Sequence, residues 1–209
     1  SRGLRRPARR LGRPAVHRPP PAAAGARDAL GTLLCPRPGA ALGLLEPVVM
    51  LPKRTRLTTF EYLGEYRYFL TFCTYDRQHT FTDPVTAASV IAQILRTSSA
   101  SGFELLAYCL MPDHAHLLVE GLQPSSDLRR FTKRLKQSSG QMYAHRAGHR
   151  LWQEGYYDRV LREGEEPKQV ARYIIENPVR AGLVRSPLDY PFIGSEKWTL
   201  EELIDSVMW

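Results

Sequence analysis

The alternation of apolar and polar residues predicts a strand-rich chain from residue 67 onward. Four runs rich in β-branched, aromatic and other apolar residues have the length and composition of β-strands: 67–75, 103–110, 114–120 and 155–162. The second and third runs are separated only by the tripeptide Met-Pro-Asp at 111–113, which favours a turn. We therefore expect these two strands to form a hairpin.

A helical spacing of apolar residues occurs between the first two strands. Asp83 followed by Pro84 is a typical helix start, and we expect this helix to run to about Ser98. Residues spaced three to four positions apart predict the face that meets the core, namely Val85, Ala88, Ile91, Ile94 and Leu95.

Two further helices are predicted after the hairpin. The first begins after Ser126 or Asp127 and is expected to bury three apolar residues spaced i, i+3 and i+7: Leu128, Phe131 and Leu135. The second spans 165–177, with Pro167 at its start and Pro178 as its stop.

The order of elements is β-α-β-β-α-β, then a helix, then a short amphipathic run at 199–209. This is the split β-α-β order of ferredoxin-like folds. The sequence thus predicts an α+β fold in which helices cover one face of an antiparallel sheet, with an additional C-terminal helix. Because this fold supports many functions, the function must be argued from the site.

Residues 1–49 have a different composition from the rest of the chain. They contain nine Arg against two acidic residues, a net charge of +7, and eight of the sixteen prolines. No hydrophobic period is present, so we expect a disordered tail, 1–49, beside one folded domain, 50–209. Since Met50 is the first methionine, upstream sequence joined by a misplaced start is one explanation. A targeting peptide and a basic nucleic-acid-binding arm are the alternatives.

The net charge of +8 is therefore weak evidence for an anionic partner of the folded domain. The remaining 160 residues hold 20 Lys and Arg against 19 acidic residues, a net charge of +1, so local clusters matter more. Three cysteines without a CxxC spacing fit a reducing cytoplasm. No run approaches the ~20 apolar residues that a membrane span needs, and we expect no membrane partner.

Two histidines in the third strand are candidates for metal binding. Alternate residues of a strand share a face, so His114 and His116 are predicted to lie side by side, opposite Ala115, Leu117 and Val119. Two polar residues on a solvated face are the ordinary interpretation. Two imidazoles with one oxygen donor suit a divalent cation that also binds phosphate.

The third helix offers that oxygen donor. Tyr173 and Asn177 are spaced i, i+4 and share one helical face, so the Asn177 carbonyl and the Tyr173 phenol could meet one cation. A half-buried tyrosine and a helix-capping asparagine before Pro178 are the structural alternative.

A cluster of cations on the second helix is a candidate phosphate-binding surface. It has no acidic residue after Asp127, and its cations are Arg129, Arg130, Lys133, Arg134 and Lys136. Arg159, near the aromatic residues Trp152, Tyr156 and Tyr157, is a further candidate contact for unpaired bases. A solvated helix face and ordinary core packing are the alternatives.

Three blocks in sequence order, MPDHAHLLVE, LWQEGYYDRVLR and ARYIIENPVRAGLV, together resemble the REP-associated tyrosine transposases. These are single-tyrosine relatives of the insertion-sequence 200/605 transposases in the HUH superfamily. The resemblance runs from near Met50 to about Trp198. It implies that His114 and His116 bind a divalent metal, Mg²⁺ or Mn²⁺, that Asn177 is a polar metal ligand and that Tyr173 is the nucleophile. Ala115 is smaller than the central residue of many members.

The resemblance also implies an activity. Such enzymes cleave and rejoin single-stranded hairpin DNA of the REP type by transesterification through a 5′-phosphotyrosine, without ATP, in the cytoplasm of bacteria at the nucleoid. One tyrosine per chain leaves open whether two chains act as a homodimer.

Alternatives remain open at this stage. Tyr156 and Tyr157 are rival nucleophiles, of which at most one could face the site because strand neighbours point to opposite faces. The chain could also be a regulatory protein that binds DNA hairpins without cleaving them, or a hydrolase that uses water as its nucleophile.

Overall fold

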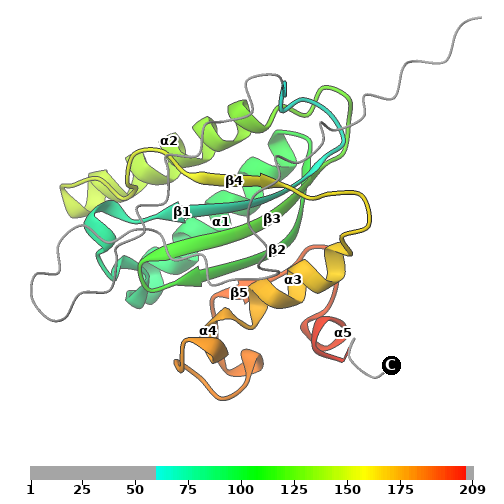
Figure 1. Cartoon of the computed structure of the whole chain (residues 1–209). Coiled ribbons are helices and arrows are strands. Elements are labelled where there is room, and N and C mark those ends of the chain that lie inside the picture. Colours follow the sequence, from blue (N-terminus) through cyan, green and yellow to red (C-terminus); the bar gives the residue numbers. More distant parts are fainter. Residues whose placement is uncertain (1–59, 206–209) are drawn as a thin grey trace, which may run out of the picture. The chain divides into compact units, whose positions relative to one another are not determined.

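The computed structural model describes residues 60–205 (Figure 1); the predicted tail, 1–49, lies outside them. A five-stranded antiparallel sheet has the strand order β4–β1–β3–β2–β5. The strands are β1 Arg67–Cys73, β2 Phe103–Met111, β3 His114–Gly121, β4 Tyr157–Val160 and β5 Ile193–Gly194. The predicted α+β fold with its split β-α-β order and its hairpin of β2 and β3 is confirmed.

Five α-helices surround this sheet in the described part of the chain. They are α1 Pro84–Ala100, α2 Leu128–Ala147, α3 Pro167–Ile175, α4 Asn177–Arg180 and α5 Leu200–Ile204. Short 3₁₀ turns occupy Tyr75–Arg77, Thr80–Thr82 and Pro187–Asp189. None of the described helices combines the length and the hydrophobicity that crossing a membrane requires.

Side-chain caps fix where the two long helices begin. The Asp83 carboxylate accepts hydrogen bonds from the backbone N–H groups of Val85 and Thr86, as the sequence predicts. Asp127 caps α2 by accepting from the N–H of Arg130. Its neighbour Ser126, the other predicted cap, instead donates its hydroxyl to the carbonyl of Gly102.

The predicted inner face of α1 is wrong in part. Val85 is 61% exposed and Ala88 is exposed as well. The buried face consists of Thr86, Ala87, Val90, Ile94, Thr97 and Ser98. The hydroxyls of Thr97 and Ser98 donate to the carbonyls one turn earlier, which satisfies them inside the core. Apolar spacing alone could not identify this half-polar face.

Pro178 acts differently from the prediction. Helix α3 does end before it, at Ile175, but helical backbone resumes in α4 with Pro178 in the first turn. The first turn of a helix does not use its N–H groups, so it accepts a proline. The chain therefore turns after Tyr173 into a second short helix rather than into a loop.

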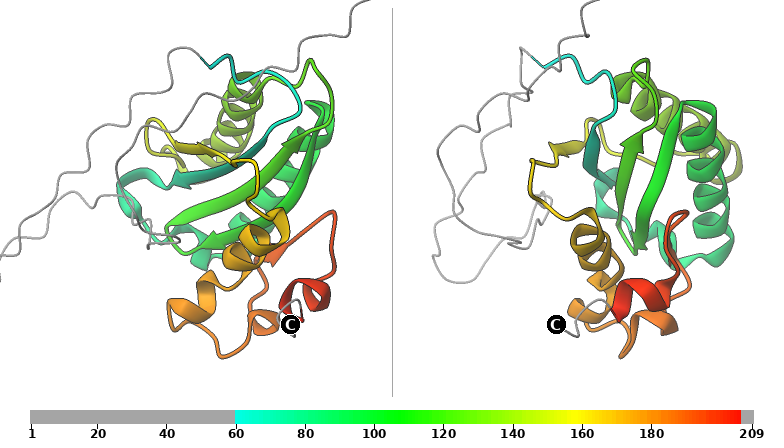
Figure 2. Two further views of the ribbon diagram at one scale, coloured as in Figure 1. Left: turned by 45° about the vertical axis from the view of Figure 1, so that its right-hand side comes forward. Right: turned by 90° about the vertical axis from the view of Figure 1, so that its right-hand side faces the viewer.

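The two faces of the sheet carry different helices (Figure 2). One, the α1/α2 face, packs its apolar side chains against α1 and α2, with Phe72, Leu117, Phe131 and Leu135 among its core. The other, the α3 face, packs Phe69, Cys109 and Leu118 against Ala171, Ile174 and Ile175. The C-terminal segment closes the α3 face, where the Tyr190 hydroxyl donates to the Leu110 carbonyl over 2.7 Å.

Candidate functional site

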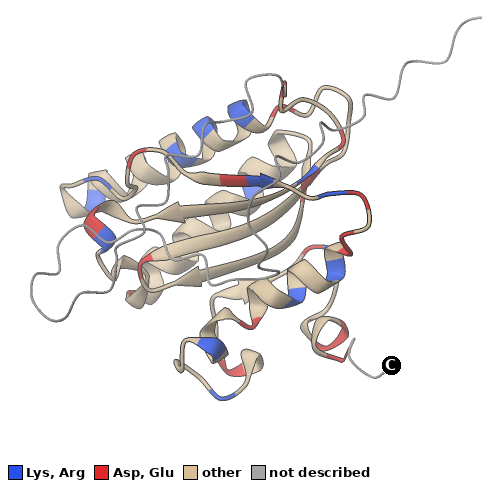
Figure 3. Cartoon of the chain, viewed as in Figure 1, with Lys and Arg blue, Asp and Glu red and all other residues tan. Residues whose placement is uncertain are grey.

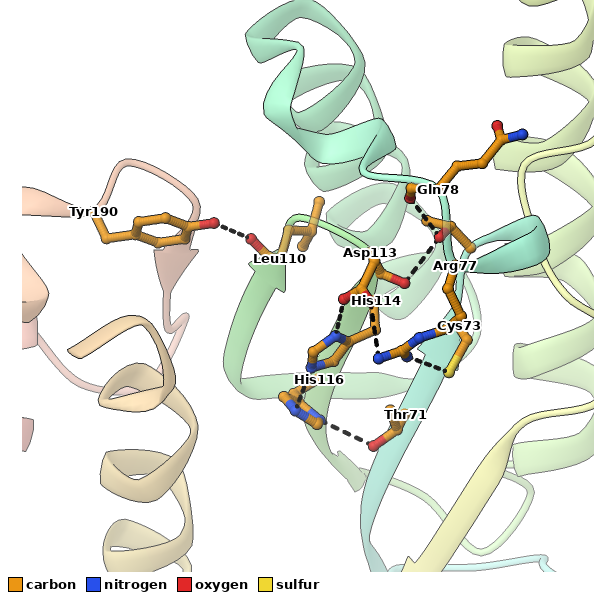
Figure 4. A network of polar contacts seen from close by, with 10 residues as sticks. Thr71, Cys73, Arg77, Gln78, Leu110, Asp113, His114, His116 and Tyr190 are labelled. Carbon is orange, nitrogen blue, oxygen red and sulfur yellow. Dashed lines mark hydrogen bonds and ion pairs between the residues drawn. The ribbon is translucent and has the colours of Figure 1, made fainter. Parts of the chain in front are cut away.

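Two imidazoles, those of His114 and His116, meet at the start of β3 (Figure 4). We call them the imidazole pair. Their Nε2 atoms lie 3.0 Å apart, and their ring centroids are separated by 4.6 Å. His116 belongs to the α3 face, because Ala115 and Leu117 lie in the core of the α1/α2 face. The predicted alternation along β3 places the two rings together as expected.

Each imidazole has a polar partner on its other nitrogen. The Nδ1 of His114 lies 2.6 Å from the Asp113 carboxylate, and the Nδ1 of His116 lies 2.9 Å from the Thr71 hydroxyl. Arg77 pairs with Asp113 at 2.9 Å, so the carboxylate is itself held in place. Partners of this kind orient a metal-binding histidine and fix its tautomer.

Burial and nearby charges set the protonation states of Asp113 and His116 in this network. Burial alone would raise the pKa of Asp113, but the hydrogen bond with His114 and the charges of His114, Arg77 and His79 lower it below its ordinary value. Burial lowers the pKa of His116 well below its usual range, and the nearby charges of His114, Arg180 and Arg77 lower it further. At neutral pH Asp113 is therefore a carboxylate and His116 a neutral imidazole.

The imidazole pair fits a divalent cation. Because a carboxylate only accepts, His114 donates from Nδ1 and presents a lone pair at Nε2. The Thr71 hydroxyl either donates or accepts, so it accommodates the tautomer of His116 that also presents a lone pair at Nε2. The two Nε2 atoms, 3.0 Å apart, converge, so a single divalent cation would be within reach of both. Within residues 60–205 no cluster of three or more His, Cys, Asp or Glu could hold a metal, so a closed structural zinc site is not supported there.

Tyr173 lies on α3, which packs on the same face of the sheet as His116. The guanidinium carbon of Arg180, from the end of α4, lies 3.9 Å from the centroid of the Tyr173 ring. The charge of the same arginine lowers the pKa of His116. Arg180 thus contacts the phenol ring directly and acts on His116 through its charge.

Asn177 caps α3. Its side-chain amide donates to the backbone carbonyls of Tyr173 and Ile174, at 3.1 and 3.0 Å. These bonds use the N–H groups of the amide and leave its carbonyl oxygen as the atom that could bind a cation. The capping and metal-binding interpretations of Asn177 are therefore compatible.

The two rival tyrosines separate onto opposite faces. The Tyr156 hydroxyl accepts a hydrogen bond from Thr132 on α2 over 3.1 Å, and its ring packs on Phe72 in the core of the α1/α2 face. Tyr157 packs against Phe69 on the α3 face. Tyr157 pairs with Thr71 on β1, and Thr71 in turn pairs with His116, so Tyr157 is the rival on the correct side of the sheet.

The Lys and Arg positions of α2 recur along this helix as separate blue segments (Figure 3). Arg130, Lys133 and Arg134 are exposed. Arg130 and Arg134, with Asp127, line a cavity of about 370 Å³ whose other walls are polar and small residues: Ser99, Ala100, Ser101, Gly102, Gln123 and Ser125. Two of the predicted phosphate contacts therefore border a polar cavity.

The other predicted DNA contacts are engaged within the protein. Arg129 lies over the Tyr62 ring at 5.1 Å. The Lys136 ammonium donates to the carbonyls of Gln153 and Gly155, and burial lowers its pKa to about 8. Arg159 pairs with Glu165. These three side chains fix the loops around the sheet.

Sequence reasoning missed four residues of this site. Thr71, Arg77 and Asp113 hold the imidazole pair, and Arg180 stacks on Tyr173. Asp113 directly precedes His114, so its position was a signal that could have found it. Thr71 and Arg77 are distant in sequence and are brought in by the pairing of β1 with β3.

Comparisons with known proteins show which family the chain resembles. Residues 63–177 match the family model described as "Transposase IS200 like". The chain is 27% identical over 139 residues to a putative REP-associated tyrosine transposase of Haemophilus influenzae, covering 60% of this chain and 77% of that protein. It is 26% identical over 100 residues to a REP-associated tyrosine transposase of Escherichia coli K12, covering 47% of this chain and 58% of that protein.

A solved structure shares the fold. It is described as a REP-associated tyrosine transposase bound to a REP hairpin, and it superposes with a TM-score of 0.54 at 22% identity, covering 63% of this chain and 78% of that chain. The family model spans β1 to the start of α4 and therefore includes both imidazoles and Tyr173. With more than half of its length matched, the chain belongs to the IS200-like transposase family.

Proposed function

We propose that this chain is a metal-dependent nuclease and transposase that cleaves and rejoins hairpin DNA of the REP type through a 5′-phosphotyrosine at Tyr173. The carrying observation is that the imidazole pair and the Tyr173–Arg180 stack occupy the same face of the sheet. Two relatives are named as REP-associated tyrosine transposases, and the REP hairpin bound to the solved relative supports this class of DNA as the partner.

In the proposed reaction, the Tyr173 oxygen attacks the phosphorus of a single-stranded phosphodiester. The new bond joins the phenol oxygen to the 5′-phosphate, the bond to the 3′ oxygen breaks, and the 3′ oxygen takes up a proton. The phenol proton passes to solvent. A 3′-hydroxyl later reverses the step, so the bond energy is retained.

The protein's own residues prepare this step. Asp113 and Thr71 fix the imidazoles, and α3 holds the phenol on the same face as the pair. A divalent cation, Mg²⁺ or Mn²⁺, held by His114, His116 and the Asn177 carbonyl would supply positive charge to the phosphate oxygens. The exposed cations of α2 would bind the phosphates of the hairpin outside this centre.

The test is formation of a covalent adduct by the full chain. Single-stranded hairpin oligonucleotides are incubated with Mg²⁺ or Mn²⁺, or with EDTA, and the products are separated on a denaturing gel. We expect an adduct with metal, none with EDTA, and none for Tyr173→Phe, whereas hairpin binding by Tyr173→Phe persists.

Each other outcome assigns a different function. Adduct formed by Tyr173→Phe but lost in Tyr157→Phe would move the nucleophile to β4. Cleaved product without adduct would indicate hydrolysis by water. Hairpin binding without any cleavage by the wild type would identify a regulatory binding protein and refute the nuclease proposal.

A further inference from the structure

Arg180 occupies a position that a helix-capping role does not fully explain. Its guanidinium carbon lies 3.9 Å from the centroid of the Tyr173 ring. The side chain is 39% exposed, although it is held at this ring by contacts with Tyr173 of α3 and with Glu176, the residue between α3 and α4. A cation stacked on the part-exposed ring of the candidate nucleophile is the arrangement that needs explaining.

The contacts of Arg180 hold it in place without using all of its donors. Nη1 lies 3.4 Å from a Glu176 oxygen, and Nη2 donates to the backbone carbonyl of Tyr173. A guanidinium has five N–H donors in a fixed fork. Donors therefore remain for a further acceptor beside the phenol, and the fork matches the oxygens of a phosphate.

The charge of Arg180 also reaches the sheet beneath α3. It lowers the pKa of His116, which burial already lowers. It opposes the rise in the pKa that burial causes at the Cys109 thiol. Cys109 and His116 are paired across β2 and β3. The position of Arg180 itself is set by its contacts with the ring and carbonyl of Tyr173 and with Glu176.

We propose that Arg180 is a catalytic residue that binds a non-bridging oxygen of the scissile phosphate and holds the phosphorus in line with the Tyr173 oxygen. This rests on the proposed function. The phosphorus must approach the phenol oxygen, and Arg180 is stacked on the ring that carries this oxygen. Arg180 keeps its proton throughout, while the phenol–phosphorus bond forms and the bond to the 3′ oxygen breaks. Its contribution is positive charge placed before the reaction begins.

Arg172 provides a matched control. It lies on α3 and pairs with the other oxygen of Glu176, with Nε at 2.7 Å. Arg180→Gln and Arg172→Gln each remove one positive charge and one ion pair with Glu176. They differ in the cation stacked on the Tyr173 ring and in the hydrogen bond from Arg180 to the Tyr173 carbonyl.

The experiment measures single-turnover adduct formation by the full chain at saturating hairpin DNA, together with hairpin affinity and the thermal midpoint. We expect Arg180→Gln to slow adduct formation by about 10²–10³-fold, the usual effect of removing one preorganised donor to a transition state. Hairpin affinity should change by less than about threefold. Arg180→Lys, which keeps the charge but loses the fork, should be intermediate, and Arg172→Gln should stay within about threefold of wild type.

A second substrate tests the contact itself. With a methylphosphonate at the scissile linkage, a methyl group replaces one non-bridging oxygen and the linkage is uncharged, so the gap between wild type and Arg180→Gln should shrink to less than about tenfold. An unchanged gap, or equal losses in Arg180→Gln and Arg172→Gln, would make Arg180 a structural cap. Normal rates in Arg180→Gln would overturn this inference while leaving the nuclease proposal intact. Absence of adduct in the wild type would overturn both.

Discussion

On β3, Ala115, Leu117 and Val119 face α1 and α2, whereas His116 and Leu118 face α3. The first set lies among fully buried aromatic and aliphatic side chains. The second set shares its face with Thr71, whose hydroxyl contacts His116, and with His114, the other imidazole of the pair. One strand thus contributes alternate residues to a dry core and to a polar site, because its side chains alternate with a period of two.

The comparison teaches how the site stays rigid. His116 is almost completely buried, with 3% of its surface exposed, and burying a polar group is costly unless it is hydrogen-bonded. The Thr71 hydroxyl on the neighbouring strand supplies that bond. The packed α1/α2 face fixes the register of β1 and β3, and that register brings Thr71 opposite His116.

The largest expected effect concerns the α1/α2 face. Phe131 on α2 is fully buried and stacks near Phe103, with ring centroids 5.0 Å apart. Phe131→Ala should lower the free energy of unfolding by about 3–5 kcal/mol, because it removes a large buried ring and leaves a cavity. Urea denaturation followed by circular dichroism measures this loss.

Tyr173→Phe on the other face is the matched comparison, since it removes one hydroxyl from a part-exposed ring. Its unfolding free energy should stay within about 0.5 kcal/mol of wild type. A similar loss of unfolding free energy in Phe131→Ala and Tyr173→Phe would contradict our inference that the α1/α2 face carries the stability and the α3 face the chemistry.

A smaller effect is expected from the pH dependence of stability. Because the pKa of His116 is lower in the folded chain than its ordinary value of 6.5, the unfolded chain binds more protons than the folded chain around and below pH 6.5, and the difference approaches one proton about one pH unit lower. The unfolding free energy therefore falls as the pH falls below 6.5, by up to about 1.4 kcal/mol per pH unit from this residue. Above pH 6.5 this contribution is constant.

The measurement compares wild type with His116→Gln in EDTA by urea denaturation between pH 5 and pH 8. The difference between their unfolding free energies should change with pH below 6.5 and should be constant above it. If the two proteins lose stability in parallel below pH 6.5, the ring of His116 titrates normally and its burial does not hold it neutral.

Local signals in the sequence predicted much of this architecture. Asp83 and Asp127 cap their helices, the tripeptide at 111–113 joins a hairpin, and His114 and His116 lie together. Each of these depends on residues a few positions apart. Turn chemistry, caps and strand alternation are set locally, so they can be derived from one sequence.

Features that depend on distant residues could not be derived in this way. The two-residue strand β5 exists because Ile193 and Gly194 meet β2. Arg77 reaches Asp113 only because β1 pairs with β3. Lys136 appeared to be one more solvent-facing cation, but the loop after Trp152 brings two carbonyls to its ammonium. Which face α3 covers is likewise decided by packing.

The smallest expected effect separates binding from chemistry on the α1/α2 side. Arg134 is exposed on α2 beside the polar cavity, far along the chain from the residues proposed to react. Arg134→Ser should weaken hairpin binding by about three- to fivefold, and the slope of log affinity against log salt should become shallower by about 0.7–0.9, which corresponds to one phosphate contact.

Lys197→Ser is the charge-matched control, because the Lys197 ammonium already pairs with Glu104 and Glu120 at 3.1 Å. Fluorescence anisotropy at several salt concentrations gives both numbers, and adduct formation at saturating DNA should be unchanged in both variants. Equal salt slopes for wild type and Arg134→Ser would mean that Arg134 on α2 does not bind DNA phosphate. A slower adduct step at saturating DNA would instead place Arg134 in the chemistry that we assign to the other face of the sheet.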